Sequence, residues 1–242
     1  MHSVWLGEFV GTLVLVYLGC GVNASVHLRK TFATDSGWMA VALGWGLAVF
    51  CGVLVAQAFG SSAAHLNPAI TLSAAINTGD FSQLPLYCSA QFLGAICGSL
   101  LMALHYAPHW KLTPDPATKL GIFCTAPAIP CAWANFVSEA LGTLFLIVVA
   151  ASIGSHGVAA SGLQPGLSPW LIACLVWAIG LGLGSTTGYA INPARDLGPR
   201  LVHFLLPLPG KGDSNWGYAP IPLLGDLTGA VLAGLLLRCA HL

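Results

Sequence analysis

Two copies of one short motif carry the most specific chemistry in this sequence. The tripeptide Asn-Pro-Ala occurs twice, and its six residues are Asn67, Pro68, Ala69, Asn192, Pro193 and Ala194. Asparagine is a favoured N-cap, because its side-chain oxygen accepts a free N–H of the first helical turn. Proline suits the first helical position, where its missing N–H costs nothing. Each motif therefore predicts a helix start, and with the oxygen used for capping we expect each amide NH₂ to be free to donate.

Other reactive side chains do not form a pattern typical of an enzyme. The eight histidines contain no HExxH pair, and the eight cysteines contain no CxxC. We therefore expect no catalytic residue, no metal and no cofactor. Most cysteines fall in apolar stretches, where cysteine behaves as a small hydrophobe. Cys124 and Cys131 share a polar-flanked segment, and the sequence leaves open whether they pair.

The composition indicates a membrane protein. Hydrophobic residues make up 56% of the 242 residues and charged residues only 7%, whereas a soluble protein carries roughly a quarter charged residues. Eight basic and eight acidic residues balance to a formal net charge of zero. Such a balance gives no reason to expect nucleic acid as a partner. The lipid bilayer is the expected surrounding.

Six apolar runs are long enough to predict membrane-spanning helices. They cover residues 4–22, 38–59, 84–106, 133–153, 169–187 and 216–238. Two further apolar stretches, 65–77 and 188–205, are interrupted by Asn-Pro and are too short beyond the proline to cross roughly 30 Å of hydrocarbon. We read them as half-helices.

The chain also contains an internal repeat. GEFVGTLVLV, from Gly7, matches SEALGTLFLI, from Ser138, and each half ends its second span before an Asn-Pro-Ala motif. Three crossings per half invert the second half in the membrane. We expect one channel domain over 1–242, with repeats of about 1–115 and 130–242 linked by segment 107–132. Short proline-interrupted segments in matching positions of two halves predict a transport site.

The two predicted helix starts meet head to head, and each carries a partial charge of about +0.5. Such a site repels cations and orients a neutral molecule that bears oxygen. The residues before the motifs are expected to expose backbone carbonyls, which is permitted at membrane depth only where they line a cavity. These residues are Ala63, Ala64, His65, Gly188, Tyr189 and Ala190. The pattern predicts a pore for neutral solutes.

At this point the sequence resembles a known family. HLNPAITL and GYAINPARDLGPR resemble the two signature loops of the aquaporin superfamily, and the likeness extends over essentially the whole chain. The resemblance implies an all-α membrane fold of six transmembrane helices and two half-helices. It also implies a homotetramer with one pore per subunit, cytoplasmic termini and a location in a plasma or bacterial inner membrane. The distribution of Lys and Arg favours the opposite orientation.

Several residues resemble the glycerol-conducting branch, the aquaglyceroporins. Asp196 follows the second motif, Arg200 lies four positions on, and Pro222-Leu223 begins the last span. The resemblance assigns the selectivity filter to Trp45, Gly180, Tyr189 and Arg195. Gly180 is expected to widen the constriction and expose a carbonyl, while the aromatic residues face alkyl groups and Arg195 donates to hydroxyls. The predicted permeants are glycerol, similar polyols and water.

Four acids in or beside the apolar segments have two kinds of expected role. Glu8 and Glu139 occupy matching positions of the repeat, and we expect them, with Asp196, to support the two loops by accepting hydrogen bonds. For Asp226, inside the last span, a helix–helix hydrogen bond is the expected role. A water-selective channel remains the alternative function, and a secondary transporter is a more distant one because it too uses inverted repeats.

Overall fold

The computed structural model describes residues 2–164 and 166–242, and regular structure in this part is helical throughout. The long helices are α1 (Val4–His27), α2 (Trp38–Ala58), α4 (Leu84–His105), α6 (Ala132–Gly154), α7 (Leu167–Gly182) and α9 (Pro220–Ala240). The shorter elements are α3 (Pro68–Thr78), η1 (Ala107–Leu112), α5 (Pro116–Phe123), η2 (Gly184–Thr186) and α8 (Pro193–Leu205).

Five of the long helices, α1, α2, α4, α6 and α9, have the length and hydropathy of membrane spans. The predicted span 169–187 is wrong in its extent, because α7 ends at Gly182 after 16 residues. At 1.5 Å per residue such a helix reaches about 24 Å. Glycines at 180, 182 and 184 weaken this end of the helix, and the chain continues in the single turn η2.

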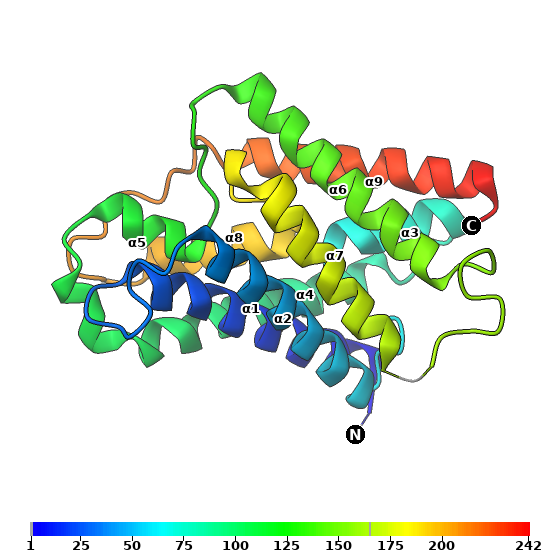
Figure 1. The fold of residues 1–242 in the computed structure, drawn as a ribbon, viewed down its shortest axis with the longest axis horizontal. Helices are drawn as coiled ribbons and strands as arrows, with labels where there is room; N and C mark the ends of the chain where they lie inside the picture. The colour runs from blue at the N-terminus through cyan, green and yellow to red at the C-terminus, as the bar shows by residue number, and fades with distance from the viewer. Residues whose placement is uncertain (1, 165) are drawn as a thin grey trace.

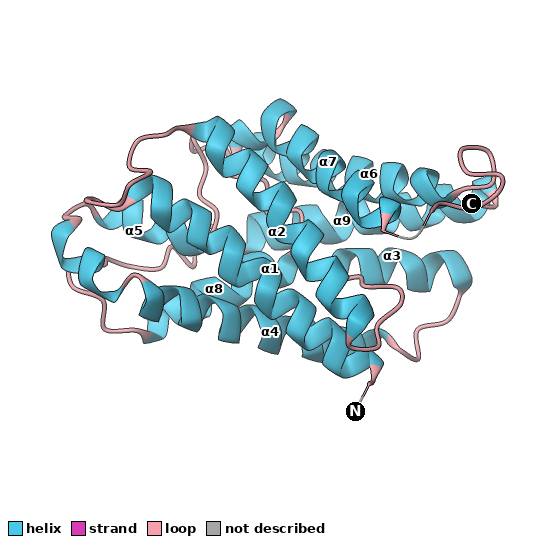
Figure 2. Ribbon diagram, turned by 60° about the horizontal axis from the view of Figure 1, so that its bottom comes forward, coloured by secondary structure: helices cyan, strands magenta, loops and turns pink. Residues whose placement is uncertain are grey.

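The two halves exchange their half-helices. Within each half one pair of long helices packs closely, α1 on α4 and α6 on α9. The half-helix α3 packs mainly on α9 of the other half, and α8 packs on α4 of the first. In Figure 1 the two half-helices lie between these pairs, with their starts toward the middle of the molecule. Figure 2 shows the same order from another side. This exchange brings residues 67 and 192 together.

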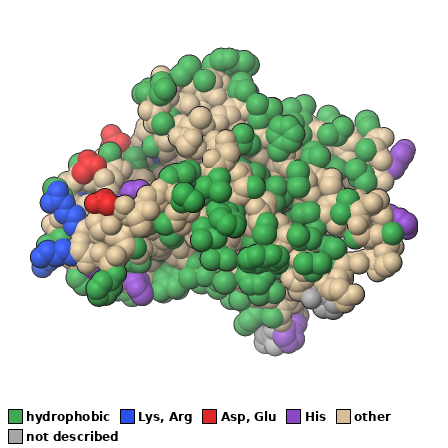
Figure 3. All heavy atoms as spheres, in the orientation of Figure 1, with side chains coloured by type: hydrophobic (Ala, Val, Ile, Leu, Met, Phe, Trp, Pro, Cys, Tyr) green, Lys and Arg blue, Asp and Glu red, His purple; other side chains and the backbone are tan. Residues whose placement is uncertain are grey.

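The surface follows the same long axis. On the face shown in Figure 3, hydrophobic side chains cover the middle, while Lys, Arg, Asp and Glu gather at the end that carries α5. Both termini lie toward the opposite end (Figure 1). An apolar belt between polar ends is the arrangement of a protein that crosses a bilayer along this axis.

Candidate functional site

The two predicted N-caps are confirmed. Asn67 Oδ1 accepts from the Ala69 N–H at 2.9 Å, and Asn192 Oδ1 accepts from the N–H groups of Ala194 and Arg195 at 3.0 and 3.2 Å. A proline occupies the first turn of each helix. Asparagine and proline thus start α3 and α8 in the interior of the molecule.

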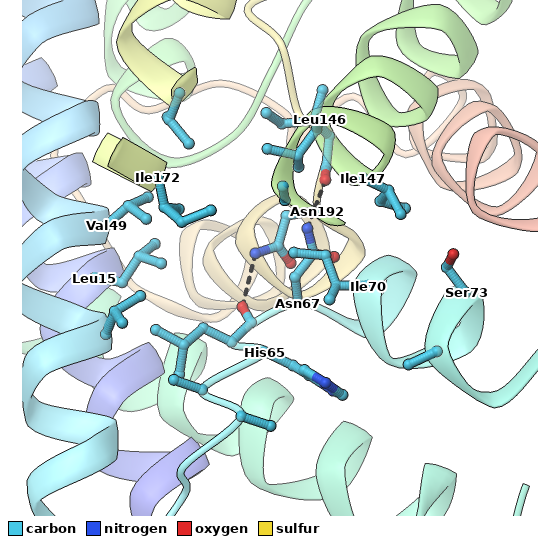
Figure 4. A pocket seen from close by; sticks show the side chains of 18 of the residues that line it. Leu15, Val49, His65, Asn67, Ile70, Ser73, Leu146, Ile147, Ile172 and Asn192 are labelled. Carbon is cyan, nitrogen blue, oxygen red and sulfur yellow. Dashed lines mark hydrogen bonds between the residues drawn. The ribbon is translucent and has the colours of Figure 1, made fainter. Parts of the chain in front are cut away.

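The asparagine amides join the two loops. Asn67 Nδ2 donates to the Ile191 carbonyl at 2.7 Å, and Asn192 Nδ2 donates to the Leu66 carbonyl at 2.8 Å. Figure 4 shows this reciprocal pair of bonds in the middle of the cavity. We expected the NH₂ group of each asparagine to be free. Each amide has two N–H donors, and one of them donates to a carbonyl of the opposite loop, so only the other remains free.

The backbone before each asparagine adopts the left-handed region at matching positions. Ala64 and Leu66 have φ of 46° and 52°, and Tyr189 and Ile191 have φ of 37° and 42°. L-residues in this region are strained by about 1–3 kcal/mol each and persist only where surrounding contacts fix them. Both loops therefore need a partner that holds their N–H groups.

Glu8 is the partner of the first loop. Its fully buried carboxylate accepts from the backbone N–H groups of His65 and Leu66 at 2.8 and 2.7 Å. The Ser61 hydroxyl and the Gln91 amide donate to the same carboxylate at 2.6 and 2.8 Å. We call Glu8 with these four donors the first cradle.

Glu139 holds the second loop in the same way. It accepts from the N–H groups of Ala190 and Ile191 at 3.0 and 3.1 Å, one on each oxygen. Asp226 lies next to it on α9, where a Cβ on the preceding Gly225 would lie 2.8 Å from the Glu139 Cβ. We call Glu139 with Ala190, Ile191 and Asp226 the second cradle.

A cavity of about 400 Å³ runs past both asparagines. One wall is aliphatic, and the loops form the other wall with the amides of Asn67 and Asn192 (Figure 4). Aliphatic lining residues include Leu15, Val49, Ile70, Leu146, Ile147 and Ile172. One end of the cavity is lined by Trp45, Tyr189 and Arg195. The other end is lined by polar residues near the ends of α2 and α3 and near the start of α7, namely Gln57, Asn77 and Ser168. The cavity therefore has one apolar and one hydrogen-bonding side.

At the end lined by Trp45, Tyr189 and Arg195, which we call the filter end, the Arg195 guanidinium carbon lies 4.0 Å from the ring centroid of Trp45. Arg195 also donates to the Phe123 carbonyl at 3.4 Å. The Tyr189 hydroxyl has no hydrogen-bond partner within the described residues. Two aromatic rings and one cation are thus brought together here, as the resemblance implied.

Comparison with known proteins agrees with this geometry. The family model described as major intrinsic protein matches residues 2–237. The chain belongs to the major intrinsic protein family. The glycerol uptake facilitator of Bacillus subtilis is 48% identical over 99% of this chain and 85% of its own length. A probable glycerol uptake facilitator of Thermotoga maritima is also 48% identical, over 95% of this chain and 96% of its own.

Solved structures add the fold. The aquaglyceroporin of Plasmodium falciparum superposes with a TM-score of 0.83 at 28% identity, covering 97% of this chain and 94% of the other. The predicted fold class, an all-helical membrane protein of the aquaporin type, is confirmed. Members of the major intrinsic protein family are passive channels and not enzymes.

The structure corrects two expectations for this family member. The Gly180 carbonyl is not free, because it accepts from the Trp38 indole N–H at 2.9 Å. The Tyr189 hydroxyl lies 2.9 Å from the position that a Cβ on Gly180 would take, so the Tyr189 ring fills the space beside this glycine. Gly188, expected to line the pore, does not line the cavity and faces Thr125. Ala63, Ala64, His65 and Ala190 do line it.

Sequence reasoning missed Trp38 and Asn23. Trp38 stands seven residues before Trp45 on α2, a spacing that puts both on one helix face and was a usable signal. Asn23, buried on α1, accepts from the Trp45 indole N–H at 3.0 Å and donates to the Gly121 and Ile122 carbonyls. Asn23 thus fixes Trp45 to the end of α5, and no local pattern reveals such a contact.

Helix α5 also binds Arg195, the cation that lines the cavity beside Trp45. Asp115 caps it by accepting from Ala117 and Thr118, and the Thr118 hydrogen bonds hold the pKa of this carboxyl below its ordinary value. The carbonyl of its last residue, Phe123, accepts from Arg195. This short helix therefore anchors both Trp45 and Arg195.

Asp196 supports a different loop from the one expected. It accepts from the backbone N–H and hydroxyl of Thr125, each at 2.7 Å, and forms a buried ion pair with Arg200 at 2.9 Å. Arg200 donates in addition to the carbonyls of Thr125, Ser214 and Asn215. The pair fastens the connecting segment to α8, the second half-helix. Cys124 and Cys131 are both free thiols.

Proposed function

We propose that this chain is a passive channel for glycerol and related small neutral polyols, together with water, and that it excludes ions and protons. The observation that carries the proposal is the reciprocal contact of Asn67 and Asn192 in a cavity with one aliphatic wall. Two helix N-termini converge there, and their partial positive charges disfavour cations. The names of two relatives, the glycerol uptake facilitator of Bacillus subtilis and the probable glycerol uptake facilitator of Thermotoga maritima, support the same solute.

The shape of the cavity matches such a solute. Glycerol carries C–H groups along one side and hydroxyls along the other, so it suits an aliphatic wall opposite amide N–H donors. One N–H of each asparagine is left for the permeant after the loop contact is made. A desolvated hydroxyl needs such partners, because an unpaired polar group in an apolar setting is costly.

Light scattering of proteoliposomes tests the proposal. A sucrose gradient reports water flux, and a glycerol gradient reports glycerol flux. We expect glycerol permeability well above that of protein-free vesicles, linear in concentration and unaffected by ion gradients. Water flux without glycerol flux would support the water-selective alternative, and saturating, ion-coupled flux would support a transporter.

We further propose Trp45, Gly180, Tyr189 and Arg195 as the selectivity filter, with Gly180 acting by leaving room for the Tyr189 ring. Replacing Arg195 by Val removes the cation that faces Trp45. We expect larger polyols or charged solutes to enter the variant more readily. Unchanged permeability to all of them contradicts this assignment.

A homotetramer with cytoplasmic termini is also proposed, in a plasma or bacterial inner membrane. Cys131 and Cys239 are exposed at opposite ends of the molecule, at the start of α6 and the end of α9. Single-cysteine variants in intact cells, treated with a membrane-impermeant maleimide, should react at Cys131 and not at Cys239. The reverse result contradicts this orientation. Chemical cross-linking in membranes checks the tetramer.

A further inference from the structure

Asp226 is a fully buried acid in the last membrane helix. It sits on the face of α9 that packs on α6, where Cβ atoms on Gly225 and Gly229 would meet Glu139 and Thr143 at 2.8 Å. Its Oδ1 accepts from the Thr143 hydroxyl at 3.1 Å. No described donor reaches its Oδ2. A carboxyl group in this position is expensive unless it is neutral or paired.

The first half of the chain shows what this position does. A Cβ on Gly94 would meet Phe9, Thr12 and Leu13, as one on Gly229 would meet Ala140, Thr143 and Leu144, the residues 131 positions later. Gly94 and Gly229 are therefore equivalent, separated by 229 − 94 = 135 positions. The same offset carries Gln91 to Asp226 (226 − 91 = 135).

Gln91 has a plain role in the first cradle, since its amide N–H donates to Glu8 at 2.8 Å. Asp226 takes the equivalent place in the second, one residue after Gly225, whose Cβ would lie 2.8 Å from the Glu139 Cβ. An ionised carboxylate accepts hydrogen bonds but donates none, so Asp226 can take the donor role of Gln91 only if it carries a proton. Two neighbouring buried carboxylates also repel each other, which favours protonation of one of them.

Among the described residues, no cation is available to pair with a charged Asp226. The charged and titratable groups that face Asp226 are Glu139 on α6, Asp196 on α8 and Tyr218 before α9. The nearby cation, Arg200, is already bound to Asp196 and to three carbonyls. Backbone N–H groups that donate to both oxygens of Glu139 favour its charged form. The proton therefore belongs on the partner.

We propose that Asp226 is protonated and that its O–H donates to the Glu139 carboxylate, so that Asp226 is the positioning residue that completes the second cradle as Gln91 completes the first. A neutral acid here replaces a neutral amide. It steadies Glu139, which in turn holds Ala190 and Ile191 next to Asn192. The transport arm of the test below rests on the proposed function, whereas the spectroscopic arm does not.

Infrared spectroscopy of the reconstituted full chain at neutral pH is the direct test. The wild-type spectrum minus that of Asp226→Asn should contain the C=O stretch of a protonated carboxylic acid, shifted to lower frequency in D₂O. Absence of this band overturns the proposal. So does a band that disappears in Glu139→Gln while Asp226→Asn retains it, because the proton then belongs to Glu139.

Transport gives the second arm, with Gln91 as the matched control. Asp226→Asn keeps a donor, so its glycerol flux should stay within about twofold of the wild type, while Asp226→Leu removes it and should reduce flux by at least about fivefold, as an orphaned buried hydrogen bond does. Gln91→Leu should act like Asp226→Leu, and Gln91→Glu should retain flux and gain a second acid band. Equal flux in Asp226→Leu and Asp226→Asn contradicts the positioning role. If Asp226→Leu does not fold, the infrared arm decides. If the wild type conducts no glycerol, the proposed function fails and the infrared result still stands.

Discussion

The two cradles hold equivalent loops with different chemistry. In the first, Glu8 is surrounded by neutral donors, the Ser61 hydroxyl and the Gln91 amide among them. In the second, Glu139 lies beside another acid, and an ion pair of Asp196 and Arg200 stands close by. The offset of the two motifs carries Asp196 onto Thr71 and Arg200 onto Ala75 (196 − 125 = 71, 200 − 125 = 75).

This difference follows the position of the filter end, which Trp45, Tyr189 and Arg195 line. Arg195 and Tyr189, which line that end, both belong to the second loop or the helix that it starts. The second half must therefore fix a buried cation as well as a strained backbone. Both halves repeat the same backbone geometry because they share a fold, whereas only the second half has the added charges, because it also positions Arg195. Substitutions at equivalent positions of the two halves separate the effect of the shared backbone from that of the added charges.

The largest effect is expected at the ion pair, which has no equivalent in the first half. Arg200→Leu leaves Asp196 buried without its cation, and removal of one partner of a buried pair costs about 3–5 kcal/mol. Thermal unfolding in detergent measures the loss. Arg200→Lys keeps a charge but loses the paired geometry, so its loss should be intermediate. Wild-type stability of Arg200→Leu contradicts the role of the pair.

Glutamine substitutions in the two cradles should have unequal effects. Gln has one acceptor oxygen in place of two. Glu8→Gln therefore leaves two of the four donors in the first cradle without an acceptor, while Glu139→Gln leaves one backbone N–H without an acceptor. Each orphaned buried donor costs about 1–3 kcal/mol, and the expected loss in Glu8→Gln is thus about twice that in Glu139→Gln.

Thermal unfolding and glycerol flux measured on both variants check this ratio. In Glu139→Gln the new amide can donate to Asp226, which further reduces the loss. The opposite order of stability would mean that Glu8 is not the more heavily used acceptor.

Glycine substitutions test the helix frame of the repeat. A Cβ on Gly11 would lie 2.7 Å from Ala56 and Leu66, whereas one on the equivalent Gly142 would meet only Ile191, at 3.1 Å. Gly11→Ala should destabilise by about 1–3 kcal/mol through overpacking. Gly142→Ala should be close to neutral, because the gain in helix propensity of up to about 1 kcal/mol offsets the tight contact. Equal unfolding temperatures of the two variants contradict the difference in packing.

The sequence allowed much of this to be predicted, because the decisive features are local. The Asn-Pro-Ala caps follow from residue type alone, and the Glu8–Glu139 repeat predicted two loop supports from spacing. The end of α7 was misjudged, since apolarity continues through Leu183 after the helix has stopped at Gly182.

Contacts between distant elements were out of reach. That Trp38 would bind the Gly180 carbonyl, or Asn23 the Trp45 indole, depends on how α1, α2 and α7 pack. The equivalence of Asp226 and Gln91 likewise depends on which residues the glycines of α4 and α9 touch. Sequence patterns specify each helix, and the pairing of helices specifies these side-chain contacts.

The smallest expected effect compares two equivalent threonines. The Thr143 hydroxyl donates to Asp226 at 3.1 Å, whereas the Thr12 hydroxyl has no partner among the described residues. Thr143→Val should therefore lose about 1 kcal/mol, the net value of one hydrogen bond. Thr12→Val removes an unpaired buried hydroxyl and should leave the unfolding temperature unchanged or raise it. If both variants unfold alike, the Thr143 bond does not stabilise Asp226, and the difference between the two cradles rests on the shared proton and the ion pair alone.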